Sequence, residues 1–156
     1  MKIGQQFAFY VQTVLQLYQL PCNKAVIRLL AMIAAHESGG FRYVQQMNNG
    51  PAKGLLQMEP VGLMEVQRYL RLRPEKFEEM PKAEALFPDM LVFDAAIAIA
   101  CARVFFMAKP EPLPHADDIE ALARYAKKHW NTEFGKATWQ DYADAYRRYC
   151  KCPQSF

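Results

Sequence analysis

The apolar stretch from Met90 to Met107 most constrains what this chain can fold into. Only Asp94 and Arg103 interrupt it with charge, and Asp89 in front of it is a suitable N-cap. The stretch is long enough to span a membrane, but each charge would cost about 2.5–3.5 kcal/mol at the centre of a bilayer. Its many alanines add little to insertion and allow close helix packing. We therefore predict one buried central helix of a helical bundle, and no transmembrane segment.

Helical periodicity extends over most of the remaining sequence, which predicts a mainly α fold. Asn23 is a good N-cap for a second apolar segment, residues 24–37, expected to form a buried helix. Residues 41–58 lack this periodicity and predict an irregular or hairpin segment. The other predicted helices cover residues 5–20, 60–73, 117–130 and 138–149, with one or two short helical turns within residues 74–88.

Composition is that of an ordinary globular chain, with 156 residues, 52% of them apolar and 22% charged. We predict a single domain, residues 1–156, because the segment after the Pro-rich loop at 109–115 is too short to fold alone. Cys22, Cys101, Cys150 and Cys152 lack the spacing of a zinc knuckle or redox motif. They are interpreted as free thiols, with no metal or cofactor, although the role of the pair at 150 and 152 stays open.

Charge is distributed unevenly along the chain, with basic end segments and an acidic middle. A basic face favours an anionic polymer but does not name it. A nucleic-acid-binding bundle is disfavoured, because the last helix mixes Arg147 and Arg148 with Asp141 and Asp144. The N-terminal segment has the pattern of an amphipathic helix and not that of a signal peptide.

The segment from His36 to Gly40 contains the first candidate for chemistry. A zinc protease motif would need histidine at Gly40, and a nucleophile elbow would need glycine at His36. What remains is Glu37, a carboxylic acid at the C-terminal end of a buried helix, where burial and the helix dipole both raise its pKa. A protonated acid near neutral pH suits glycoside cleavage. Equally, Glu37 could cap its helix or pair with an arginine.

Two further segments strengthen the first interpretation. The motif Glu37-Ser38-Gly39-Gly40-Phe41 is followed by Gly54-Leu55-Leu56-Gln57-Met58, and then by Trp130-Asn131 with Gly135. In this order the three motifs resemble the Glu-Ser, Gly-Leu-Met-Gln and Tyr-Asn motifs of the soluble lytic transglycosylase and goose-type lysozyme family.

The resemblance implies a lysozyme-like fold, mainly α with a small α+β character. It implies cleavage of the β-1,4 bond between N-acetylmuramic acid and N-acetylglucosamine, with Glu37 as the catalytic acid. Ser38, Gln57, Met58, Trp130 and Asn131 would bind substrate in the cleft. Tryptophan in place of the family's tyrosine lacks the phenolic hydroxyl, which Tyr125, a further candidate in the cleft, could supply instead.

The reaction type depends on a second carboxylate. Residues between Ser38 and Met58 include no acid, which favours a transglycosylase in which Glu37 alone acts first as acid and then as base. Glu59 is the candidate second carboxylate. If it faces the cleft it could position water, as in a hydrolytic goose-type lysozyme, and if it caps the helix beginning at Pro60 it is structural.

Small chains of this kind resemble bacteriophage lysins. The implied partner is bacterial peptidoglycan, with no nucleic acid partner, and a monomer is expected. The protein would be made in the cytoplasm and reach the periplasmic wall after holin-mediated release or as part of the virion. The competing class is a non-enzymatic wall-binding or virion structural domain that retains the fold.

Overall fold

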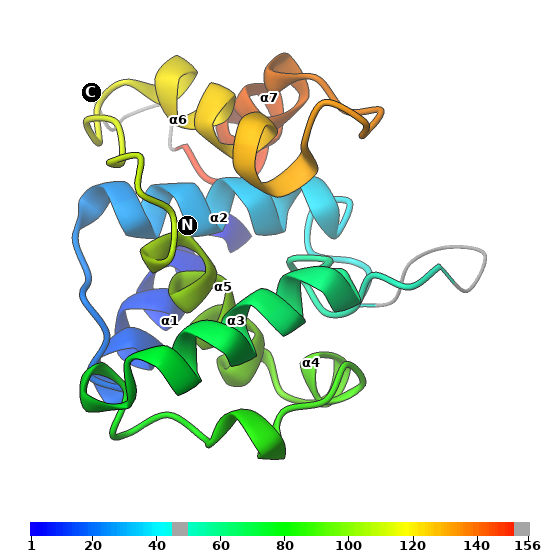
Figure 1. The fold of residues 1–156 in the computed structure, drawn as a ribbon. Coiled ribbons are helices and arrows are strands. Elements are labelled where there is room, and N and C mark those ends of the chain that lie inside the picture. The colour runs from blue at the N-terminus through cyan, green and yellow to red at the C-terminus, as the bar shows by residue number, and fades with distance from the viewer. Residues whose placement is uncertain (45–49, 152–156) are drawn as a thin grey trace.

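The structure, a computed structural model, describes residues 1–44 and 50–151 and is mainly helical (Figure 1), which confirms the predicted fold class. Its α-helices are α1 (Ile3–Leu17), α2 (Lys24–Glu37), α3 (Pro60–Leu72), α4 (Met90–Phe93), α5 (Ala95–Met107), α6 (Ile119–Ala126) and α7 (Trp139–Tyr149). Shorter turns are η2 (Pro74–Lys76), η3 (Ala83–Ala85) and the π-helical turn η4 (Lys127–Asn131). Among the described residues no strand forms. One isolated antiparallel bridge joins Lys53 to Met58, and the predicted α+β detail goes no further than that.

Helix α2 is the element on which the other helices pack. Its buried residues run without a break from Leu29 to Ala35, and it contacts α1, α5, α6 and α7. In Figure 1 it crosses the middle of the molecule, with α6 and α7 on one side and α1, α3 and α5 on the other. The Asn23 side chain accepts a hydrogen bond of 2.9 Å from the Val26 amide, as expected of an N-cap. The sequence placed both ends of this helix correctly.

The prediction of one continuous helix from Met90 to Met107 was wrong. The chain is extended at Asp94, and this residue ends α4 and begins α5. The Asp94 carboxylate accepts a 3.0 Å hydrogen bond from the Ile97 amide, so it caps α5. Asp89, the predicted cap, accepts no such bond from α4, whose residues are all described. A capping side chain inside an apolar run therefore divided it, and α5 alone forms the buried helix.

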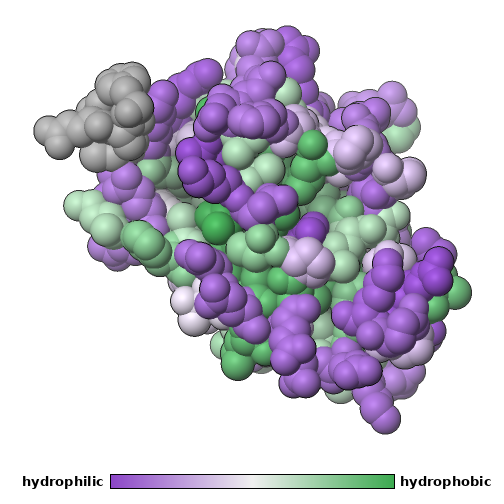
Figure 2. Space-filling model, turned by 90° about the vertical axis from the view of Figure 1, so that its left-hand side faces the viewer, coloured by the Kyte–Doolittle hydropathy of each residue, from purple (hydrophilic) through white to green (hydrophobic). Residues whose placement is uncertain are grey.

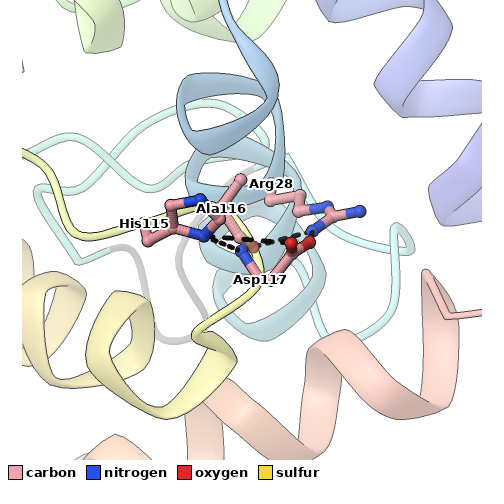
Figure 3. A network of polar contacts seen from close by, with 4 residues as sticks. All are labelled: Arg28, His115, Ala116 and Asp117. Atoms are coloured by element: carbon pink, nitrogen blue, oxygen red, sulfur yellow. Dashed lines mark hydrogen bonds and ion pairs between the residues drawn. The ribbon is translucent and has the colours of Figure 1, made fainter.

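The helix predicted to begin after Asp117 begins one residue later. Asp118 is its N-cap and accepts a 2.9 Å hydrogen bond from the Ala121 amide. Asp117 instead forms an ion pair with Arg28 of α2 at 2.8 Å, and the same guanidinium donates to the Ala116 carbonyl at 2.7 Å (Figure 3). These bonds attach the loop before α6 to α2. The α-helix also ends earlier than predicted, at Ala126, where the π-helical turn takes over.

The core draws side chains from nearly the whole described chain, from Phe7 of α1 to Cys150 after α7. On the face shown in Figure 2, hydrophobic residues lie in hollows between ridges of hydrophilic ones. None of the helices in the described part of the chain combines the length and apolarity needed to cross a membrane.

Three of the cysteines fall in the described ranges. Cys22 is exposed, Cys101 and Cys150 are buried, and all three are free thiols. Cys152 lies outside the described residues, as do residues 45–49 of the predicted irregular segment.

Removing the N-cap of α5 tests whether Asp94 is what divides the apolar stretch of residues 90–107 into α4 and α5. We expect Asp94→Ala to lower the free energy of unfolding by about 0.5–2 kcal/mol, because an amide of the first turn loses its acceptor. Urea denaturation measures the change. Asp89→Ala is the matched control and should cost less than about 0.5 kcal/mol. Equal losses in the two variants would contradict the assignment of Asp94 as the cap.

Candidate active site

A cleft of about 740 Å³ lies between the C-terminal end of α2, the start of α3 and the π-helical turn η4. This volume is in the range of small-ligand sites. Residues from all three motifs line it, although the motifs are far apart in the sequence. The predicted site residues in its wall are Glu37, Gln57, Met58, Glu59, Trp130 and Asn131.

Glu37 is half-buried at the end of α2 and faces the cleft. Burial raises the pKa of its carboxyl to about 7, because the charged form loses its hydration. The negative charge of Glu59 acts in the same direction, and a hydrogen bond from Tyr142 acts against both. Among the described residues at the cleft, Lys109 forms an ion pair with Glu65 and His129 a hydrogen bond with Glu111, and neither contact includes Glu37. The acid is therefore poised to be protonated near neutral pH.

A chain of hydrogen bonds holds this carboxyl from the side of α7 and η4. The Tyr142 hydroxyl donates to Glu37 Oε1. Asn131 is hydrogen-bonded in turn to Tyr142 and lowers the pKa of its hydroxyl, as a donor would, although burial and the Glu37 charge raise that pKa overall. Lys127 Nζ donates to Asn131 Oδ1 at 2.6 Å. Because the Tyr142 hydroxyl already donates its proton to Glu37, it accepts from the amide nitrogen of Asn131. Lys127, Asn131 and Tyr142 thus fix the orientation of Glu37.

The loop before α3 carries Gln57 and Met58. Backbone bonds of 2.9 and 3.0 Å between Lys53 and Met58 close it into a tight turn. Gln57 has a positive φ of 54°, and its side-chain amide donates to the Gly54 carbonyl at 2.7 Å. Gly54 itself has φ 81° and lies against the Leu91 carbonyl, where a Cβ would come within 2.6 Å of the oxygen. Only glycine fits there, and this packing sets the position of Gln57 in the wall.

Trp130 connects this loop to η4. Its indole Nε1 donates to the Leu56 carbonyl at 2.9 Å, and its ring stacks on Phe106 and meets Phe105 edge-on. The ring is partly buried and also reaches the cleft wall. Trp130 therefore has a packing role as well as an exposed edge that a ligand could contact.

Glu59 occupies the N-cap position of α3 by its backbone, but its side chain accepts no capping bond from the first turn, which lies wholly in the described range. Pro60 follows at N1, where proline has no N–H to satisfy. The Glu59 side chain is exposed and lines the cleft. The sequence left open whether Glu59 faces the cleft or caps the helix beginning at Pro60. The structure has it facing the cleft.

Two predicted residues are not brought to the cleft wall that the described residues form. Ser38 is buried, and its hydroxyl donates to the Ala34 carbonyl at 2.5 Å and accepts from the Phe41 amide at 2.6 Å, so it holds the turn after α2. The Tyr125 hydroxyl donates to the Glu111 carbonyl at 2.9 Å. The expectation that Tyr125 supplies a hydroxyl to the acid was wrong, because Tyr142 does so.

Sequence reasoning missed Tyr142 and Lys127 as site residues. The sequence shows only that Tyr142 lies on a helix with other aromatics at helical spacing, which also describes a core position. Nothing local pairs it with an acid 105 residues away. The site depends on how α7 packs against α2.

A second hollow, of about 840 Å³, lies between α1, α2 and α7, away from Glu37. Its one acid, among the described residues that line it, is Asp117, and the hydrogen bond from Arg28 lowers the pKa of that carboxyl. A carboxylate held in its charged form by an arginine is a poor proton donor. The cleft at Glu37 is therefore the candidate active site.

Comparison of the chain with protein-family models, with curated proteins and with solved structures gives no match.

The raised pKa of Glu37 predicts how stability depends on pH. Its folded pKa of about 7 lies above the ordinary value of 4.5, so the folded state binds more protons between these values and loses stability as pH rises through them. The free energy of unfolding of Glu37→Gln, relative to that of wild type, should increase by about 1–3 kcal/mol between about pH 5 and about pH 8. Chemical denaturation across this range measures it.

Glu78→Gln removes an exposed carboxyl from the loop after η2 and serves as the control for that comparison. Its difference from wild type should stay nearly constant with pH. Parallel profiles for Glu37→Gln and wild type would show that the Glu37 carboxyl is not held in its neutral form by the fold.

Proposed function

We propose that this protein is a peptidoglycan-degrading glycosidase that cleaves the β-1,4 bond between N-acetylmuramic acid and N-acetylglucosamine. The observation that carries the proposal is the carboxyl of Glu37, whose pKa is raised to about 7 at the wall of a cleft large enough for a ligand. The resemblance of the three motifs to the lytic transglycosylase and goose-type lysozyme family supplies the substrate class.

Glu37 acts first as an acid in this proposal. It transfers its proton to the glycosidic oxygen as the bond from that oxygen to C1 of muramic acid breaks, and the sugar ring takes up positive charge. Tyr142 donates to the Glu37 carboxyl, and the same bond stabilises the carboxylate that the transfer leaves behind. A pKa near 7 lets the group be protonated before the step and a usable base after it.

The second step needs one base and a nucleophile. We propose that the carboxylate of Glu37 takes the proton of the muramic acid 6-hydroxyl while that oxygen bonds to C1. The product is a 1,6-anhydro sugar, no water is consumed, and Glu37 is protonated again. One carboxyl therefore serves the whole lytic transglycosylase reaction.

Gln57, Trp130 and Asn131 contribute the substrate contacts in this proposal. An amide such as that of Gln57 can hydrogen-bond sugar hydroxyls and N-acetyl groups, and Trp130 offers apolar surface to the sugar rings. Met58, predicted to bind substrate, is buried with 4% exposure and supports the cleft wall from behind. Ser38 contributes only indirectly, through the turn that it holds.

A hydrolytic lysozyme is the second candidate, and one observation favours it. Glu59 lines the same cleft, its side chain makes no capping bond within the described first turn of α3, and its charge contributes to the raised pKa of Glu37. A second carboxylate at the cleft could activate water for attack at C1. The products would then carry ordinary reducing ends.

The proposal also includes how the enzyme reaches peptidoglycan. The enzyme would act on the periplasmic wall as a bacteriophage lysin, either after release through a holin-made lesion or as a component of the virion. This part rests on the resemblance to small phage enzymes.

The first test is Glu37→Gln with purified peptidoglycan. We expect the rate of solubilisation to fall by at least about a hundredfold, because glutamine is isosteric but cannot donate the proton. Glu78→Gln should keep wild-type activity. Activity of Glu37→Gln within a few-fold of wild type, with an unchanged melting temperature, would refute the assignment of the acid. Binding to the wall without cleavage by wild type would instead indicate a non-enzymatic wall-binding domain.

Glu59→Gln separates the two reaction types. For the transglycosylase we expect a loss of less than about tenfold and soluble products that are one water molecule lighter than hydrolysis products. The pH at which activity falls should also move down, because the Glu59 charge no longer raises the pKa of Glu37. Mass spectrometry and a pH–rate profile measure these effects. A loss of more than about tenfold together with reducing-end products would establish hydrolysis through Glu59.

A further inference from the structure

Phe134 stands out on the surface beside the cleft. Its side chain is 89% exposed and lies on the loop between η4 and α7. The residue lines the active-site cleft and also a second, smaller hollow of about 490 Å³ on the other side of the same loop. Thr132 borders both hollows as well. The two hollows are thus neighbours on either side of this loop, and Phe134 borders both.

The loop that presents Phe134 is fixed by hydrogen bonds. Lys127 Nζ donates to Asn131 Oδ1 and, at 2.9 Å, to the Gly135 carbonyl. The Gly135 amide donates to the Thr132 carbonyl at 3.3 Å, and Gly135 packs so closely on the Asn131 side chain that a Cβ would collide with it. Lys127 therefore ties this loop to the same asparagine that orients Tyr142. Phe134 is therefore held in its exposed position by the hydrogen bonds of the turn at residues 131–135, which begins at the asparagine beside Tyr142.

The outer hollow combines aromatic rings with hydrogen-bonding side chains. Trp139 forms its inner wall, with the Arg124 guanidinium 4.3 Å from the ring centroid. Arg124 is also paired with Glu120 at 2.8 Å, and Lys128, another lining residue, is paired with Glu111 at 2.8 Å. Arg124 and Lys128 are thus neutralised, and Glu133 adds a negative charge to a lining whose other cation is Lys127. This balance disfavours a phosphate or an acidic peptide as the ligand. Ring faces beside planar polar groups suit an uncharged, polyhydroxylated ligand.

We propose that the outer hollow is a sugar-binding subsite that holds the glycan strand where it leaves the cleft over Phe134. Its ligand is an N-acetylated amino-sugar residue of the strand, packed against the rings of Phe134 and Trp139. The choice of this ligand rests on the proposed function, because the hollow adjoins the cleft and shares Thr132 and Phe134 with it. Phe134 acts as a specificity-determining residue that favours long strands over short fragments.

The test compares Phe134→Ala with Phe93→Ala on long glycan strands and on short fragments. Phe93 is the matched control, a phenylalanine that is 82% exposed on α4 and lines neither hollow. We expect Phe134→Ala to raise KM for long strands roughly three- to tenfold and to raise KM for short fragments, which do not reach the outer hollow, by a much smaller factor. Phe93→Ala should match wild type. Equal effects on long and short substrates, or no effect of Phe134→Ala, would overturn the proposal.

A binding measurement separates this proposal from the function on which it rests. Oligomers of N-acetylglucosamine should change the tryptophan fluorescence of wild type, and Phe134→Ala should weaken their binding by the same factor. If wild type cleaves no peptidoglycan but binds these oligomers through Phe134, the result supports the sugar-binding subsite and refutes the proposed glycosidase activity. Cleavage that does not depend on Phe134 refutes the subsite alone, and absence of both cleavage and binding refutes both.

Discussion

The contact between Glu37 and Tyr142 is the interaction on which the site depends. It joins the end of α2 to the first turns of α7, two helices from distant parts of the chain. Burial against α7 removes hydration from the carboxyl and raises its pKa, while the hydroxyl of Tyr142 limits that rise. The packing of α7 on α2 therefore acts on the pKa of Glu37 in both directions. Burial raises it, and the hydrogen bond from Tyr142 keeps the charged form accessible near neutral pH.

Residues of the π-helical turn η4 support the site from two sides. Trp130 holds the Gln57 loop through the Leu56 carbonyl, and Asn131 and Lys127 support Tyr142 from behind. The phenolic hydroxyl that meets Glu37 comes from Tyr142 of α7. Short π-helical segments are frequent at functional sites because they shift the register of the side chains that follow, and here the shift lies between α6 and the loop that carries Phe134.

Local patterns in the sequence predicted most of the helices. Asn23 and the run of apolar residues after it define α2, and Thr138 with Asp141 forms the capping box that begins α7. These features act over three or four residues, so they can be recognised without tertiary contacts. The errors arose where two local signals competed. Asp94 could be a tolerated charge in a long helix or the cap of a new one, and Asp117 and Asp118 are adjacent candidates for the same cap.

By itself the sequence determined the mainly α fold, the position of Glu37 at the end of a buried helix, and the three motifs whose residues line the cleft. These follow from periodicity, capping and short spacing, which are properties of neighbouring residues. Only the tertiary structure decided that Tyr142 and not Tyr125 meets the acid, that Ser38 is buried, and that Glu59 faces the cleft. Each of these depends on which helix faces pack together, and the hydrophobic burial that drives such packing is not directional. The partner of a given carboxyl is therefore settled by the whole core.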